Sequence, residues 1–142
     1  MRIEYRQSVE GLGWEQLDGF FVGWPVRPSA ATLLEHLARS YRCVVAVDVS
    51  KDPDRVVGIA TAISDGLLSA SIPLVEVLPG WHDRGIGTEL LERLLDSLAH
   101  LYMVDLTCDE DVAPFYARLG FTRGTAMIRR NGRALEPYAE ER

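Results

Sequence analysis

The feature that most constrains the fold is a glycine-rich turn that runs directly into a leucine-striped segment, in LPGWHDRGIGTELLERLLDSL, residues 78–98. After Gly85 the apolar residues recur every three or four positions, which is typical of an amphipathic helix. Glu89 and Arg93 face away from them with the i,i+4 spacing of an ion pair. The pattern predicts a helix whose buried face is formed by Ile86, Leu90, Leu91, Leu94, Leu95 and Leu98.

Strands and helices alternate over the rest of the chain, which predicts one mixed α/β domain over residues 1–142. Ser29 is the N-cap candidate of a second helix, and Asp65 with Gly66 signals a hairpin. A short helix and then a loop are expected within 13–25. Helices are expected at 29–41 and 110–120, strands at 1–7, 43–49, 55–64 and 67–79, a buried strand at 101–108, and a last strand or strand pair at 121–132.

Pro73 interrupts the long strand predicted for residues 67–79. Proline lacks the N–H that a sheet ladder requires, so inside a strand it indicates an edge, a bulge or a place where the pairing lapses. The sequence leaves these three alternatives open.

Composition places the chain among ordinary soluble proteins, with 47% hydrophobic and 25% charged residues. A net charge of −6 argues against general nucleic-acid binding. The N-terminus lacks the apolar core of a signal peptide and no run is long enough to span a membrane, so we expect a cytoplasmic protein. Cys43 and Cys108 are interpreted as reduced core thiols, although the sequence does not exclude a disulfide. The three histidines show no metal-ligand spacing, so no metal site is predicted.

The turn before the helix has the chemistry of an anion site. The first turn of a helix has unpaired N–H groups and the positive end of the helix dipole. Gly85 and Gly87 allow close approach to the backbone, and Arg84 adds a positive charge. A dinucleotide fingerprint would need glycine where Leu90 stands, and a P-loop would need a lysine that is missing. By itself the turn does not decide between an anion site and a turn made only for tight packing, and short motifs of this kind favour packing.

Two motifs together resemble the GCN5-related N-acetyltransferases (GNAT). That family has Q/R-x-x-G-x-G/A after a long bulged strand, and a later helix that ends in F-Y-x-x-x-G-F. The first motif matches at Gly85 and Gly87, and Arg84 stands at a position that is commonly basic. The motif departs at His82, where the family usually has Gln or Arg, and at Asp83, which is often a glycine. The second motif is intact as Phe115, Tyr116, Gly120 and Phe121. The resemblance implies a mixed, mostly antiparallel sheet flanked by helices, with a splayed, bulged strand that forms an acyl-CoA cleft.

The resemblance also implies acetyl-CoA as the acyl donor. Its pyrophosphate would lie on the backbone of residues 83–88, and its pantetheine arm would pair with the splayed strand at 75–77. Asp109 stands where many family members carry an asparagine that faces the cofactor. The cofactor-binding residues implied in this way are Val75, Val77, His82, Asp83, Arg84, Gly85, Ile86, Gly87, Thr88 and Asp109.

The implied reaction is transfer of an acetyl group from acetyl-CoA to a primary amine of a small molecule, by direct attack of the amine. Tyr116 matches the family position of the general acid, with a core aromatic as the alternative, and a backbone N–H near Val77 would stabilise the oxyanion. Glu76 and Asp65 are candidates for a general base acting through water. A solvated carboxylate at Glu76 explains the sequence equally well, and many relatives need no dedicated base.

The family's acceptor-binding loop corresponds to residues 18–25. Phe20, Phe21 and Trp24 there either line an acceptor pocket, with Asp65 near it, or belong to the core. Two other functions stay open: acetylation of a protein or peptide, and an acyl-CoA sensor without catalysis. A homodimer is a further expectation, because such domains often pair through their last strands.

Overall fold

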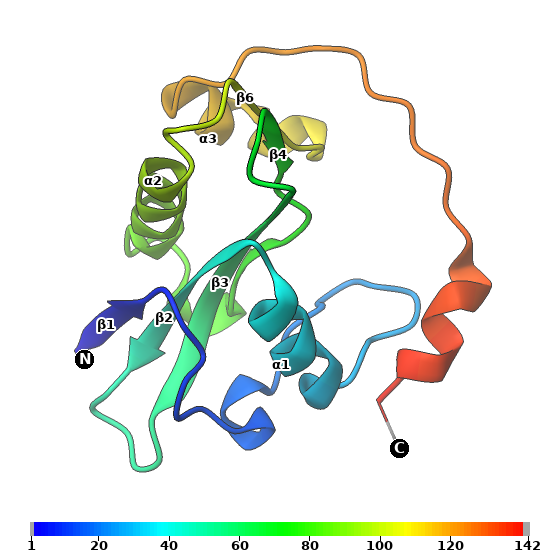
Figure 1. Ribbon diagram of the computed structural model, residues 1–142. Coiled ribbons are helices and arrows are strands. Elements are labelled where there is room, and N and C mark those ends of the chain that lie inside the picture. Colours follow the sequence, from blue (N-terminus) through cyan, green and yellow to red (C-terminus); the bar gives the residue numbers. More distant parts are fainter. Residues whose placement is uncertain (1, 141–142) are drawn as a thin grey trace.

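The computed structural model describes residues 2–140, which are arranged around a twisted, mostly antiparallel sheet (Figure 1). The sheet order is β1-β2-β3-β4-β6, with β5 paired to β3, and only the β4–β6 pair is parallel. This architecture confirms the mixed, mostly antiparallel sheet predicted from the motifs. The strands are β1 Ile3–Arg6, β2 Arg42–Asp48, β3 Arg55–Ser64, β4 Ser69–Ser71, β5 Val75–Val77 and β6 Met103–Asp105.

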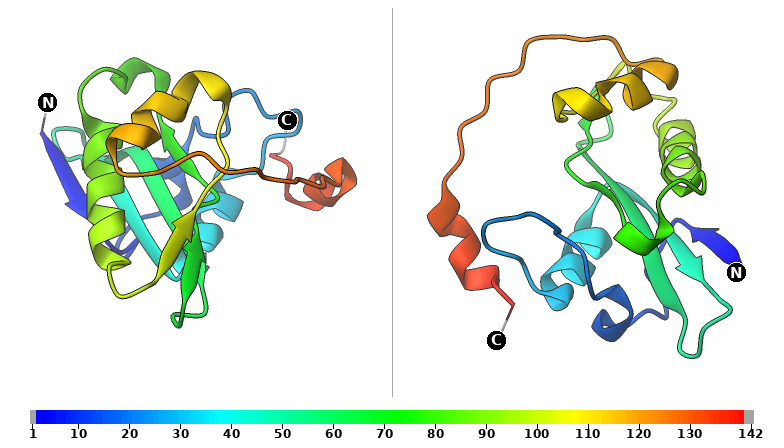
Figure 2. Two further views of the ribbon diagram at one scale, coloured as in Figure 1. Left: turned by 90° about the horizontal axis from the view of Figure 1, so that it is seen from above. Right: turned by 180° about the vertical axis from the view of Figure 1, so that it is seen from behind.

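Two helices flank this sheet, and the alternation of side chains along β3 shows that they lie on opposite faces (Figure 2). A Cβ on Gly58 would point at Leu90 of α2, whereas Thr61 contacts His36 of α1 on the other face. The Ser29 hydroxyl caps α1 by accepting the Thr32 N–H at 3.1 Å, as expected. The α-helices are α1 Ala30–Arg39, α2 Ile86–Ser97 and α3 Ala113–Arg118; the 3₁₀ helices are η1 Trp14–Leu17, η2 Pro79–Trp81, η3 Glu110–Val112 and η4 Gly132–Tyr138.

Helix α2 forms from the leucine stripe, and its apolar face is buried on β2 and β3. Leu90, Leu91 and Leu94 are completely buried, and the Glu89–Arg93 ion pair forms on the outer face at 2.7 Å. At the contact with the sheet, a Cβ on Gly58 would lie 2.9 Å from Leu90 Cδ1. Glycine at this position therefore lets α2 approach the sheet closely.

Pro73 lies where the sheet pairing lapses. The long strand expected at 67–79 is two short strands, β4 and β5, which pair with different parts of β3. Between them, the Ile72 N–H donates to Asp105 O and the Thr61 N–H donates to Leu74 O. Both strands pair with β3, but the register shifts by one residue across Pro73, from Ile63 opposite Ser71 to Ala60 opposite Val75. The missing N–H of Pro73 therefore costs no ladder bond there.

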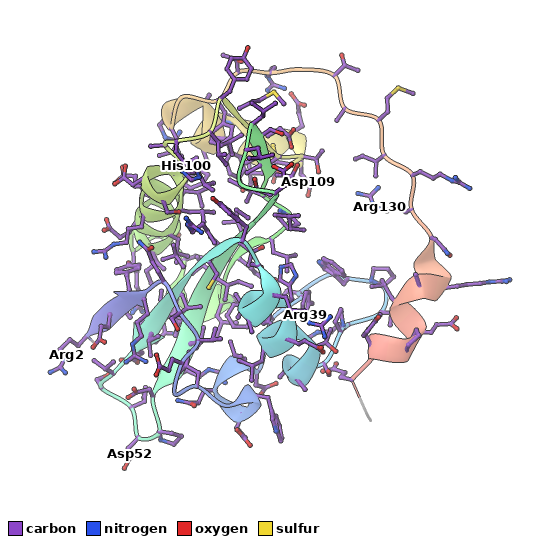
Figure 3. The ribbon with its side chains drawn as sticks, viewed as in Figure 1. Arg2, Arg39, Asp52, His100, Asp109 and Arg130 are labelled. Atoms are coloured by element: carbon purple, nitrogen blue, oxygen red, sulfur yellow. The ribbon has the colours of Figure 1, made fainter. Side chains whose placement is uncertain are left out.

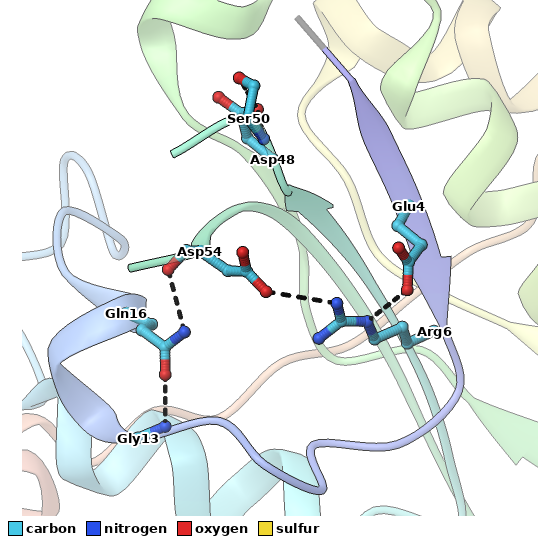
Figure 4. Close-up of polar contacts among 7 residues, drawn as sticks. All are labelled: Glu4, Arg6, Gly13, Gln16, Asp48, Ser50 and Asp54. Atoms are coloured by element: carbon cyan, nitrogen blue, oxygen red, sulfur yellow. Dashed lines mark hydrogen bonds and ion pairs between the residues drawn. The ribbon is translucent and has the colours of Figure 1, made fainter. Parts of the chain in front are cut away.

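A polar network ties the N-terminal segment to the turn between β2 and β3 (Figure 4). Arg6 contacts Glu4 at 3.0 Å and Asp54 at 3.4 Å. Gln16 donates to Asp54 O at 3.0 Å and accepts the Gly13 N–H at 2.8 Å. The network fixes η1 on the body of the protein immediately before the loop at 18–25.

Three expectations are corrected by the structure. Strand β6 is present but not buried, because Met103 is 46% exposed. Residues 121–131 form no strand, because no neighbouring backbone pairs with them. Cys108 is exposed rather than in the core, and neither cysteine is in a disulfide.

Across residues 2–140, none of the helices is both long and apolar enough to cross a membrane.

Candidate active site

A cleft opens between β5, the start of α2 and helix α3, with a volume of about 560 Å³. It collects residues from three segments that are separated in the sequence: the splayed strand, the glycine turn and the F-Y motif. Most of the residues expected to bind the cofactor line this cleft. The lining consists of Val75, Glu76, Val77, Trp81, His82, Asp83, Gly85, Ile86, Gly87, Thr88, Val112, Phe115 and Tyr116.

The backbone of β5 presents hydrogen-bonding groups to the cleft. On either side of β5, Leu74 O accepts from Thr61 N–H at 3.0 Å and Leu78 N–H donates to Val57 O at 2.9 Å. In an antiparallel pair the bonding alternates, so Val75 and Val77 direct their N–H and C=O groups away from β3. The Val77 carbonyl accepts a hydrogen bond from His82 Nε2 at 2.8 Å. The Val77 N–H therefore remains a donor directed toward the cleft.

The turn before α2 is shaped to hold an anion. Asp83 and Gly85 both have left-handed backbone conformations, with φ of +62° and +77°. Such conformations turn successive N–H groups toward one concavity, which lies at the positive end of a 12-residue helix. A Cβ at Gly87 would lie 3.6 Å from Phe115 and 3.9 Å from Val77, so the missing side chain keeps this part of the cleft open.

Two residues expected at the cofactor do not line the cleft. The Arg84 guanidinium carbon lies 4.8 Å from the centre of the Trp81 ring, in a cation–π contact at the rim. Asp109 is exposed and begins η3, where its carbonyl accepts the Val112 N–H at 3.1 Å (Figure 3). Both residues are held by local contacts in this structure, and their contact with the cofactor stays a prediction.

Tyr116 is half-buried in the lining of the cleft. Its ring meets Phe115 and Phe121 edge to face, with centroid distances of 5.0 Å and 5.8 Å. Burial, with a smaller contribution from nearby Cys108, raises the pKa of the Tyr116 phenol. The hydroxyl consequently keeps its proton at neutral pH.

Glu76 holds the loop at 18–25. Its carboxylate accepts the Phe21 N–H at 2.9 Å and the Val22 N–H at 3.3 Å. Phe21 has a φ of +64°, which is an unfavourable backbone conformation for a bulky residue. The two hydrogen bonds from Glu76 help to maintain this conformation. The carboxylate is thus not simply solvated, and no local sequence pattern indicates this contact between residues 55 positions apart.

The expected acceptor residues separate into two groups. Phe20 and Phe21 are core residues, only 3% and 5% exposed, which is the second of the two alternatives left open by the sequence. Trp24 is 39% exposed and packs edge-on against Phe21. Asp65 is exposed, lies outside the cleft and accepts the Leu67 N–H of its own turn at 3.0 Å.

Three residues of the cleft were not singled out as binding residues from the sequence. Phe115 is part of the F-Y motif, so its place could have been inferred from its neighbour. Trp81 carries a weaker signal, as an aromatic beside the glycine turn. Val112 carries none, because a single valine before a short helix is common in any fold.

The fold and cleft agree with comparisons to known proteins. The chain belongs to the acetyltransferase (GNAT) family, whose model matches residues 9–121. A crystal structure of a Deinococcus radiodurans protein described as an acetyltransferase is 46% identical, with a TM-score of 0.87 over 92% of this chain and 90% of that one. The family assignment made from the two motifs is thereby confirmed.

Relatives in plants are longer than this chain. The chain is 34% identical to the histone acetyltransferase TAP1 of Glycine max over 70% of its own length, which is 47% of that protein. It is 31% identical to the chloroplastic GCN5-related N-acetyltransferase 1 of Arabidopsis thaliana, over 88% of this chain and 67% of that protein. The chain thus spans less than half of the soybean relative.

Proposed function

We propose that this protein transfers an acetyl group from acetyl-CoA to a primary amine of a small molecule, by direct attack of the amine. One observation carries the proposal: a single cleft combines a left-handed turn at a helix N-terminus, the outward-facing backbone groups of β5 and a tyrosine whose raised pKa keeps it protonated. These three parts correspond to the pyrophosphate, the pantetheine arm and the reacting thioester of acetyl-CoA.

The residues of the cleft fit acetyl-CoA. The N–H groups of the turn at 83–88 would bind the pyrophosphate, because they converge at the positive end of α2. The outward N–H and C=O groups of Val75 and the N–H of Val77 would bind the pantetheine amides as an added strand. When bound, acetyl-CoA supplies an activated acyl group that an amine can attack.

Two groups of the protein would assist the transfer. The Val77 N–H would donate a hydrogen bond to the thioester oxygen as negative charge develops on it. Tyr116 would donate its phenolic proton to the departing sulfur, and the raised pKa keeps that proton in place until it is needed. The attacking amine must be neutral, because only the free base has the electron pair that forms the new C–N bond.

The acceptor is proposed to approach from the loop at 18–25, on the face of β5 that carries Glu76. The partly exposed Trp24 adds an aromatic surface to this loop, against which an amine's apolar part could pack. A protein acceptor is the second candidate, since one relative is named a histone acetyltransferase.

The test is release of free coenzyme A thiol from acetyl-CoA in a panel of aryl and alkyl amines together with a lysine-containing histone-tail peptide. Turnover on small amines, absent in Tyr116→Phe, supports the proposal. Turnover on the peptide alone would replace the proposed acceptor by a protein. Tight binding of acetyl-CoA with no turnover on any amine would show a sensor rather than an enzyme.

A further inference from the structure

Two charged side chains hold the same peptide group of the loop at 18–25. The Arg27 guanidinium donates to the Phe20 carbonyl from Nη2 at 2.7 Å and from Nε at 3.3 Å. The Glu76 carboxylate accepts the Phe21 N–H at 2.9 Å. This carbonyl and this N–H belong to one peptide bond, so a cation holds one end of the peptide and an anion holds the other. Hydrogen bonds to charged groups are the stronger kind, and bonds that share an amide reinforce one another.

The orientation of this peptide decides where the rest of the loop lies. Phe21, which follows it, has the left-handed backbone conformation. Phe20 and Phe21 point into the core, whereas Val22 is 56% exposed and Trp24 is partly exposed. The Trp24 ring packs edge-on against Phe21 at a centroid distance of 5.0 Å. A change in the Phe20–Phe21 peptide would therefore move the side chains that the loop presents to an acceptor.

Residues 138–140 hold the backbone of Arg27. They run antiparallel to residues 27–29, beside the loop (Figure 1). Two backbone hydrogen bonds, of 2.8 Å and 2.9 Å, join the two segments, and the second runs from the Glu140 N–H to Arg27 O. The Arg27 guanidinium therefore extends toward the loop from a fixed backbone position.

The ion pair between Arg27 and Glu140 is the weaker part of this arrangement. Its Nε–Oε1 distance is 4.0 Å and both side chains are partly exposed, so it contributes little. By contrast, the Phe20 carbonyl receives two donors of one planar guanidinium. The main task of the guanidinium is thus to hold the loop.

We propose that Arg27 is a positioning residue for the amine acceptor. It keeps the Phe20–Phe21 peptide against Glu76 and so maintains one shape of the loop on the acceptor side. Arg27 does not line the acetyl-CoA cleft, so its loss should leave cofactor binding intact. The acceptor role rests on the proposed function, whereas the hold on the peptide does not.

Hydrogen exchange followed by NMR tests the hold on the loop without any substrate. Arg27→Met keeps an aliphatic side chain and removes the donors, so the amides of Phe21 and Val22 should exchange about 10-fold faster. Arg27→Lys retains one charged donor and should restore part of the protection. Arg39→Met is the matched control, because Arg39 is an exposed arginine of α1 that pairs with Glu35 (Figure 3). Its loop amides should exchange as in the wild type.

Thiol-release kinetics test the role in acceptor binding. With an amine that the wild type accepts, Arg27→Met should raise the amine KM about 10-fold, change kcat by less than about two-fold and leave acetyl-CoA affinity unchanged by calorimetry. Arg27→Lys should recover part of the loss. Because Arg27 and Glu76 act through one peptide, the double variant Arg27→Met/Glu76→Gln should raise KM by about 10-fold as well. Independent losses would multiply to about 100-fold.

Substitutions at Glu140 test the contribution of residues 138–140. Glu140→Pro removes the N–H that fixes the Arg27 backbone and should raise the amine KM several-fold. Glu140→Gln keeps that N–H and should behave as wild type. No effect of the proline would overturn the role of this segment.

The remaining outcomes decide the role of Arg27 itself. An unchanged amine KM in Arg27→Met would overturn the proposal, whether or not the loop amides exchange faster. So would an equal loss of acetyl-CoA affinity, which would indicate general damage to the fold, or fully multiplied effects in the double variant. If no amine releases thiol while the exchange rates change as expected, the proposed function is contradicted and the hold of Arg27 on the loop stands.

Discussion

Burial raises the pKa of the Tyr116 phenol, so the hydroxyl stays protonated until well above neutral pH. If this proton is transferred to sulfur, Tyr116→Phe should lower kcat by about 100-fold while acetyl-CoA affinity stays nearly unchanged. The wild-type kcat should show no decline caused by this residue below about pH 10. Thiol-release kinetics and isothermal titration calorimetry measure the two quantities. A kcat that survives the substitution would leave Tyr116 as a packing residue.

Glu76 is the second residue that a single substitution can test. Because its carboxylate accepts two backbone N–H groups of the loop at 18–25, Glu76→Gln should disorder the acceptor side. We expect the amine KM to rise about 10-fold, equivalent to one lost hydrogen bond of about 1.4 kcal/mol, with the shape of the kcat–pH profile retained.

The control for this experiment is Glu92→Gln on the exposed face of α2, which should behave as wild type. If Glu76 instead acts as the general base, kcat will fall and the acidic limb of its pH profile will disappear. That outcome would assign the residue to proton transfer rather than to loop positioning.

At the residue level, the sequence placed residues correctly where the signal was local. Gly85 lies in the turn before α2, and Phe115 and Tyr116 line the same cleft, while their roles in binding and catalysis stay predictions. The hydrogen-bond partners of Glu76 could not be predicted, because the contact joins residues far apart in the chain and depends on how the loop folds. For the same reason, an aromatic pair such as Phe20 and Phe21 could not be assigned to core or pocket before its burial was known.

At the level of elements, the start of α2 should be sensitive to side-chain size. Gly87→Ala would place its Cβ at ordinary contact distance from Phe115, but the two further methyl groups of Gly87→Val would enter the cleft. We expect Gly87→Val to weaken acetyl-CoA binding by about 10-fold or more, with little change for alanine. Neither variant should lower the unfolding temperature greatly, since both residues are better helix formers than glycine. Unchanged affinity in the valine variant would disprove the binding role of the turn.

At the contact between α2 and the sheet, by contrast, a larger side chain should lower the stability of the fold. A Cβ at Gly58 would lie 2.9 Å from Leu90 and 3.2 Å from Ile86, so Gly58→Val must push the helix away from β3. Overpacking of this kind costs about 1–3 kcal/mol of stability. Thermal unfolding followed by circular dichroism should show a lower midpoint. Gly80→Val, where a Cβ meets open space, is the control, and an equal loss in both would contradict this explanation.

Element prediction was reliable for α2, because its leucine stripe specifies both the helix and its buried face. It failed for residues 121–131, whose composition favours a strand. A helix satisfies its backbone internally, whereas a strand needs a neighbouring edge that the local sequence does not encode. The same limit explains why β6 was expected to be buried.

For the whole molecule, ligand binding should increase the free energy of unfolding. At a concentration about 100 times its Kd, acetyl-CoA should stabilise the folded state by about 2.7 kcal/mol and raise the unfolding temperature by several degrees. Coenzyme A should have nearly the same effect, because it carries the same pyrophosphate and pantetheine. Scanning calorimetry measures the shift. A shift of equal size in Gly87→Val would place the ligand outside the cleft.

In the proposed binding mode, the cleft would recognise acetyl-CoA largely through main-chain atoms, those of Val75, Val77 and the turn at 83–88. Main-chain groups are the same in every residue but proline, so substitutions that preserve the backbone path leave the donors in place. The donors therefore do not depend on the side chain at position 82, whereas position 83 must still adopt a left-handed conformation, which Asp tolerates better than a bulky residue does. His82 can thus be recruited to fix the Val77 carbonyl without loss of the cradle.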